Sequence, residues 1–167
     1  VLLSVARVWT RLPDWGGRGE GLVTSAVRIS ENSYRANYYY AAMLYNEQYV
    51  KIPDVANGKI SPEKETLLAT IEEHLSRSLD VYPGYSLAAV LEVSVATERY
   101  RQDGKLDKLL GRFERLIQAK PENGDMLIPV LSVLKSLKGS DPNIYDAFCH
   151  RIGNKLKFKK TQGNFNE

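Results

Sequence analysis

The chain has 167 residues, of which 43% are hydrophobic and 26% are charged, and its formal net charge is +3. These values are those of an ordinary globular protein, and the length suits one domain with a real hydrophobic core. The single cysteine, Cys149, excludes an internal disulfide, so nothing indicates a disulfide-stapled secreted scaffold.

The first residues are apolar but too few to cross a bilayer, which takes about 20. Residues 2–9 carry one apolar face at helical spacing, and no basic region precedes them as in a signal peptide. Because the chain begins at Val1 rather than Met, we expect an excerpt or a processed product. Residues 1–12 are then either the stump of a membrane span or a leading helix. The protein is accordingly expected to be either membrane-associated through residues preceding Val1 or cytoplasmic.

Helical periodicity continues along the chain from Glu20, and no stretch reads as a convincing strand. Ser33 and Ser61 stand where an N-cap is expected, and residues 49–60 lack a helical period and predict a loop. Helices are predicted at residues 20–29, 34–48, 62–79, 85–102, 105–119, 126–137 and 142–157.

Residues 81–121 predict a helix–turn–helix unit. Its two amphipathic segments, 85–102 and 105–119, are separated by Asp103-Gly104 and bounded by Pro83 and Pro121. One such pair cannot bury its apolar stripe alone, which is typical of a helical repeat.

The spacing within this unit resembles the tetratricopeptide repeat (TPR). The matching positions are Ala96, Thr97, Tyr100, Gly104, Leu109, Phe113, Leu116 and Pro121. Leu109 and Leu116 depart from the family, which prefers alanine at those positions. The preceding unit shares the closing end, with Ile71, Leu75, Ser78 and Pro83. The closing prolines are 121 − 83 = 38 residues apart, against about 34 in the family.

This resemblance covers roughly residues 19–152. It implies an all-α fold, a TPR-like α-solenoid of antiparallel helix pairs wound into a right-handed superhelix. The domain is expected to span residues 1–160, followed by a frayed polar tail at 161–167. An α-solenoid of another family is the alternative.

A second resemblance lies near the start. The run Arg11-x-Pro13-Asp14-Trp15, followed by Asn32-Ser33-x-Arg35-Ala36, is similar to the junction in polytopic membrane proteins with a C-terminal TPR region, including the transmembrane-and-TPR O-mannosyltransferase type. It implies a regulatory or structural soluble tail of a membrane-embedded glycosyltransferase-like protein. The catalytic residues of such proteins lie in the membrane portion, so no catalytic residue is carried over.

In TPR proteins, the face of each first helix opposite its packing stripe lines a concave groove. If Tyr40, Ala41 and Leu44 face the core, helical spacing places other residues of the predicted helix 34–48 on the groove side, and the matching residues of the predicted helix 85–102 continue that side. Its residues are Arg35, Tyr38, Ala42, Tyr45, Asn46, Ser94, Glu98 and Arg101.

Six tyrosines fall between Tyr34 and Tyr49, and flat rings with polar tips suit a binding surface. One interpretation is a groove for a protein or peptide partner, anchored by Tyr38 and Tyr45, with Arg35 pairing with an acidic residue of the partner. The alternative is that Tyr39 and Tyr40 belong to the core while the other rings fill helix seams.

Other candidates for chemistry are weak. A lone His74 on an exposed helix face lacks the three or four ligands of a metal site. Cys149 and His150 lie about 100° apart on a helix, which disfavours a nucleophile–base pair. Cys149 is expected to be a small buried hydrophobe, and Glu72 with Glu73 a solvated charge. We therefore predict no enzyme, catalytic residue, metal or cofactor.

The net positive charge is concentrated at residues 151–160. Such a basic end is typical of a solvated helix terminus, and nucleic-acid binding is the less favoured interpretation.

Overall fold

The computed structural model describes residues 20–54, 60–119, 127–139 and 142–151, and within them all regular structure is helical. This confirms the all-α class. The predicted helix at residues 2–9 and the tail at 161–167 lie outside the described residues. The elements are α2 (Glu20–Ile29), α3 (Tyr34–Met43), the π-helical η1 (Leu44–Gln48), the 3-10 η2 (Tyr49–Lys51), α4 (Pro62–Val81), α5 (Ser86–Asp103), α6 (Leu106–Ala119) and α7 (Leu127–Leu137), with residues 144–151 also helical.

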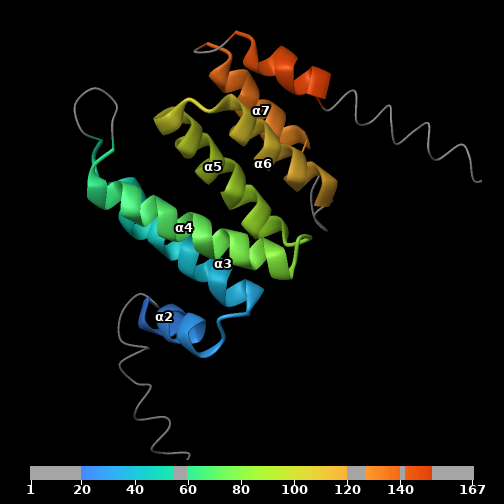
Figure 1. Cartoon of the computed structure of the whole chain (residues 1–167). Helices are drawn as coiled ribbons and strands as arrows, with labels where there is room; N and C mark the ends of the chain where they lie inside the picture. Colours follow the sequence, from blue (N-terminus) through green and yellow to red (C-terminus); the bar gives the residue numbers. More distant parts are fainter. Residues whose placement is uncertain (1–19, 55–59, 120–126, 140–141, 152–167) are drawn as a thin grey trace, which may run out of the picture.

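The helices stack in chain order (Figure 1). The closest packing joins α3 to α4, and α4 in turn packs on α5 and α5 on α6. Helix α5 also contacts α3 on one side and α7 on the other, while α2 covers α3 at the N-terminal end. Alternate helices α3, α5 and α7 therefore succeed one another along the molecule.

The ends of these helices follow the local signals. Ser33 Oγ accepts from the amide of Ala36 at 3.3 Å, and Ser61 Oγ accepts from that of Lys64 at 3.1 Å. Both side chains satisfy amides that have no partner within their own helix. Gly104 ends α5 in the left-handed region, with φ of 64°, and its N–H donates to the carbonyl of Tyr100. The predicted break at Gly104 is confirmed.

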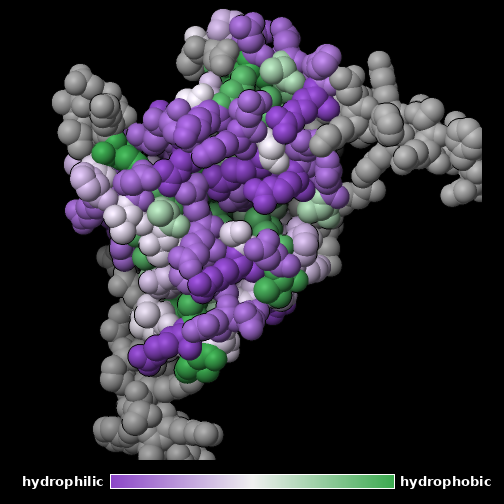
Figure 2. Space-filling view, in the orientation of Figure 1, coloured by the Kyte–Doolittle hydropathy of each residue, from purple (hydrophilic) through white to green (hydrophobic). Residues whose placement is uncertain are grey.

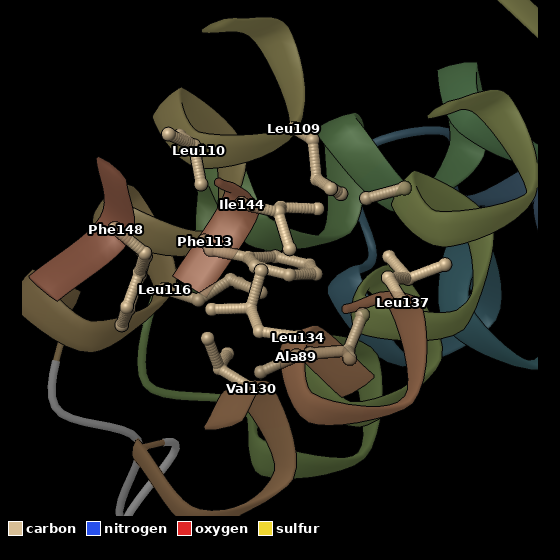
Figure 3. Close-up of a cluster of buried hydrophobic side chains, with 12 residues drawn as sticks. Ala89, Leu109, Leu110, Phe113, Leu116, Val130, Leu134, Leu137, Ile144 and Phe148 are labelled. Atoms are coloured by element: carbon tan, nitrogen blue, oxygen red, sulfur yellow. The ribbon is translucent and has the colours of Figure 1, made fainter. Parts of the chain in front are cut away.

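Two hydrophobic cores share α5. One, shown in Figure 3, has Phe113 at its centre and is built from α5, α6, α7 and residues 144–151. The other joins α3, η1 and α4 to α5. Ala89 and Val93 of α5 face the first core, while Ala88 and Val95 face the second. Most of the buried residues of α5 are small or β-branched, so neighbouring helices can pack closely on both of its sides.

The prediction of a loop from residue 49 is wrong at its start. Helical turns continue to Lys51, and the Tyr49 side chain is only 3% exposed. Lys64 Nζ lies 4.7 Å from the centre of the Tyr49 ring and donates to the carbonyl of Ile52 at 2.8 Å and to Asp54 Oδ1 at 2.6 Å. The buried Tyr49 ring and the contacts of Lys64 hold residues 49–54 against α4. Periodicity could not predict these contacts, because this part of the sequence has no helical period.

Candidate protein-interaction face

Helix α3 and η1 divide into a buried and an accessible side. Ala36, Ala41 and Leu44 are buried against the neighbouring helices, as predicted. The predicted site residues of this segment all keep contact with solvent. Arg35 and Asn46 are exposed, and the other three, Tyr38, Ala42 and Tyr45, are partly buried.

Of the predicted residues of α5, Glu98 and Arg101 lie close enough to Tyr45 of η1 to act on its hydroxyl. Ser94 and Glu98 are partly buried and Arg101 is exposed, so none of them belongs to the core. Arg101 Nη1 pairs with Glu98 Oε1 at 2.6 Å. We call the surface formed by Arg35, Tyr38, Ala42, Tyr45, Asn46, Ser94, Glu98 and Arg101 the α3–α5 face.

Tyr45 anchors the C-terminal end of this face. Its ring stacks on that of Tyr49 with the centroids 5.4 Å apart and the planes within 12°. Burial raises the pKa of the Tyr45 hydroxyl, and the nearby Glu98 carboxylate raises it further while Arg101 opposes that effect. Tyr45 therefore stays protonated at neutral pH, and the structure brings it together with the ion pair of α5.

A cluster of tyrosines occupies the N-terminal end. The Tyr38 ring meets that of Tyr85 edge-to-face at 5.2 Å, and Tyr39 lies 5.2 Å from Tyr38. Tyr34 lies 5.0 Å from both Tyr82 and Tyr85. Such tilted contacts match the preferred geometry of aromatic pairs. The rings fix one another, so Tyr38 is held in place from two sides.

Sequence reasoning did not place Tyr82 and Tyr85 at the site. They flank the turn between α4 and α5, one on either side of the Pro83-Gly84 pair. The signal was the presence of two tyrosines beside the closing proline. The two tyrosines contact those of α3 only because the α4–α5 turn packs against α3.

Arg35 borders the tyrosine cluster. Its Nε donates to the Tyr34 hydroxyl at 3.0 Å, and its guanidinium carbon lies 5.5 Å from the centre of the Tyr34 ring. The hydrogen bond with Tyr34 raises the pKa of Arg35, so its charge is permanent. Among the described residues, no carboxylate forms an ion pair with Arg35. Its charge is presented to solvent at this end of the face.

The alternative in which Tyr39 and Tyr40 are core and the other rings fill helix seams holds in part, because Tyr38, Tyr40 and Tyr45 pack against the core that joins α3, η1 and α4 to α5, whereas Tyr39 does not. Tyr39 is 52% exposed. Tyr40 is partly buried and meets the ring of His74 edge-on at 4.7 Å. The reason is geometric, because consecutive residues of a helix point about 100° apart and only one can face α4.

His74 is buried, not exposed as expected. It is 9% exposed, and its Nδ1 lies 2.7 Å from Oδ1 of Asn37, which is fully buried on α3. The Asn37 amide nitrogen donates to the carbonyls of Glu31 at 2.6 Å and Ser33 at 2.9 Å. Asn37 thereby joins the turn before α3 to α4. This polar pair stabilises the position of α3 and with it the face.

On another side, α4, α5 and α6 are joined by a network of charges, and Figure 2 shows predominantly hydrophilic side chains where these helices meet. Arg99 pairs with Glu65 and, at 2.6 Å, with Glu72. Arg112 pairs with Glu72 and Glu92, each at 2.6 Å. The expectation of a solvated Glu72 is therefore wrong.

Burial acts to raise the pKa of the Glu72 carboxyl, but hydrogen bonds from Arg99 and Arg112 outweigh it and hold that pKa below its usual value. Two hollows of about 450 and 530 Å³ flank the network. Both are lined by Glu72 and Arg112, whose charged groups are already paired with each other. In neither hollow, therefore, is the charge of Glu72 or Arg112 available to a ligand without breaking this ion pair.

Cys149 is exposed and not buried as expected, because the apolar stripe of its helix runs through Ile144 and Phe148. In the part of the chain that the structure describes, no three metal-binding side chains come together. No helix in the described ranges is long and apolar enough to cross a membrane. Of the basic residues 151–160, only Arg151 is described, and its Nε lies 3.0 Å from Glu114 Oε2.

Comparison with protein-family models, with curated proteins and with solved structures found no match. The resemblances to the TPR and to the membrane-protein junction remain predictions from the sequence pattern. Residues 11–15, which carry much of the second resemblance, lie outside the described residues.

Proposed function

We propose that this chain is a non-enzymatic interaction module that binds a segment of a partner protein on the α3–α5 face. In this proposal the helices form a TPR-like, right-handed α-solenoid, and the α3–α5 face lies on its concave side. Helices α3, α5 and α7 are the first helices of successive pairs, and α4, α6 and residues 144–151 are the second ones.

A repeated ion pair supports the assignment of repeats. Arg112 of α6 pairs with Glu72 of α4, 40 residues earlier, and Arg151 pairs with Glu114 of α6, 37 residues earlier. Each pair joins one proposed second helix to the next. These separations bracket the 121 − 83 = 38 residues between the closing prolines. The two ion pairs thus join successive second helices over similar separations, although Glu72 and Glu114 lie at different distances from their closing prolines, Pro83 and Pro121.

The observation that carries the function is the way two tyrosines are held at the accessible surface. Tyr38 is fixed against Tyr85, and Tyr45 is stacked on Tyr49, yet both rings remain only partly buried. Rigid aromatic rings with a polar tip lose little entropy when a partner covers them, and tyrosine is enriched at protein interfaces. The ion pair of Glu98 and Arg101 then supplies a polar rim.

The experiment is selection of a random peptide library on the immobilised protein. We expect enrichment of peptides whose retention is lost on the Tyr38→Ala/Tyr45→Ala double variant. The double variant should lose less stability than Phe113→Ala, a core truncation that costs about 3–5 kcal/mol.

Peptides that bind the double variant as tightly as the wild type would contradict the proposal. A loss of stability as large as that of Phe113→Ala would show that the two rings are core. The face would then not be a binding surface.

A further inference from the structure

We infer that the α3–α5 face takes a proline-rich segment in the polyproline II conformation, with prolines over Tyr38 and Tyr45 and an acidic residue beside Arg35. This inference rests on the proposed function and names the class of its partner.

The spacing of the two rings fits this conformation. Tyr38 and Tyr45 are seven residues apart, about two helical turns, which places them about 10 Å apart along the helix axis. A polyproline II helix advances about 3.1 Å per residue and about 9 Å per three-residue turn. Prolines three positions apart therefore repeat at nearly the axial separation of the two tyrosine positions.

The hydroxyl groups fit the same ligand. A polyproline II segment has no internal hydrogen bonds, so its carbonyls accept bonds from the protein that binds it. The Tyr38 and Tyr45 hydroxyls are protonated at neutral pH, as tyrosine is at its ordinary pKa, and burial raises that pKa further, so both hydroxyls can donate. Each ring is also held by a neighbouring aromatic ring, at 5.2 Å for Tyr38 and 5.4 Å for Tyr45. Preorganised rings lower the cost of binding.

The surroundings of the rings disfavour an amphipathic helix as the occupant. Such a helix needs a continuous apolar groove for its side chains at i, i+3, i+4 and i+7. Ala42 is the small residue between the two rings, and Asn46 and Ser94 are polar members of the same face. On α5, Leu87 and Val90 are each 50% exposed and lie one to two turns before Ser94, so the small and polar surroundings that suit an extended backbone belong to the α3 and η1 side of the face.

The charged residues at the two ends of the face determine at which end an acidic residue of the ligand would bind. At the Tyr45 end, Arg101 is already paired with Glu98. At the Tyr38 end, Arg35 is exposed and forms no ion pair with a carboxylate of the described residues. An acidic residue next to the prolines would be attracted to the Tyr38 end.

The test is a fluorescence-anisotropy titration of the full chain with a labelled proline-rich peptide of about ten residues, three turns of polyproline II, carrying one acidic end. We expect saturable binding. Tyr38→Ala and Tyr45→Ala should each weaken it about tenfold, the loss of one aromatic contact. Arg35→Gln should weaken binding of this probe and leave unchanged the binding of a second proline-rich probe whose end is neutral. Tyr145→Ala, outside the face on residues 144–151, should leave the affinity unchanged.

Two further probes decide the class of partner. A glycine–serine peptide of equal length and charge, and an amphipathic helical peptide, should bind at least about tenfold more weakly than the proline-rich probe. Equal binding of the flexible peptide, or tighter binding of the helical one, overturns the inference.

The outcome separates this inference from the proposed function. Helical peptides that bind the wild type and are lost on the tyrosine double variant would leave the α3–α5 face as a binding surface and overturn its preference for proline. Absence of binding by every selected peptide and every probe would overturn both.

Discussion

Asn37 of α3 and His74 of α4 form a buried polar pair, with His74 Nδ1 2.7 Å from Asn37 Oδ1. The amide group of Asn37 is fully used, because its nitrogen donates to two backbone carbonyls of the preceding turn. The imidazole nitrogen next to it must therefore carry a proton, so the neutral ring is the Nδ1–H tautomer.

Removal of the Asn37 side chain should be costly. Asn37→Ala leaves His74 and the carbonyls of Glu31 and Ser33 without their partner, and we expect a loss of about 2–3 kcal/mol in the free energy of unfolding. Asn46→Ala is the matched control, since Asn46 is exposed and should change stability by less than about 0.5 kcal/mol. Urea denaturation of the two variants measures the difference. Equal losses would contradict the buried role of Asn37.

The stability of the chain should depend on the protonation of His74. Burial lowers the pKa of His74 below its ordinary value of 6.5, and the charge of Arg77 lowers it further while Glu73 opposes this effect. The unfolded chain then binds the proton first, so stability is full above about pH 6.5 and falls as the pH drops through that value.

Chemical denaturation between about pH 5 and 8 checks this dependence. His74→Gln should flatten the slope, whereas His150→Gln, at the other histidine and on an exposed site, should leave it. A slope that survives in His74→Gln would assign the titration to another group.

Arg112 should be the costliest residue to remove from the charge network. Arg112→Ala leaves Glu92, which is 7% exposed, and Glu72 without this cation, and we expect a loss of about 3 kcal/mol. Arg112→Lys should not restore the lost stability, because one ammonium group cannot bind Glu72 and Glu92 from two sides as the planar guanidinium group does. Arg115→Ala, at an exposed position of the same helix, is the control in thermal melts. A similar shift in both variants would show that the network adds little.

Local signals in the sequence predicted the helices well. The bounds of α5 and α6 fall within one residue of those predicted, because the apolar period, the Asp103-Gly104 break and the flanking prolines all act within a few residues. The accessible side of α3 could also be predicted, since positions three and four apart share a face of a helix. The predicted membership of the face rests on that geometry.

Contacts between distant residues could not be predicted. Asn37 and His74 are 37 positions apart, and a histidine between glutamates looks solvated until α3 covers it. Glu72 likewise meets Arg99 and Arg112 only after α5 and α6 have packed. In each case the sequence contains the residue but not the partner that determines its burial.

Gly104 should resist substitution for a reason of backbone geometry. Its φ of 64° is strained for any residue with a Cβ, although a Cβ there would meet no atom within 4 Å. We expect Gly104→Ala to cost about 1–2 kcal/mol. Gly139→Ala has equal space and no positive φ, so it should be neutral within about 0.5 kcal/mol. Differential scanning calorimetry compares them, and equal melting shifts would contradict this explanation.

The central claim is that partners bind on the α3–α5 face. Its most direct test is a two-dimensional amide NMR titration of the protein with a peptide selected on it. We expect the largest shift changes at Tyr38, Tyr45, Ser94 and Glu98, and none of comparable size at Arg112 in the charge network. Changes centred on Arg112 and the two hollows around it would contradict the claim.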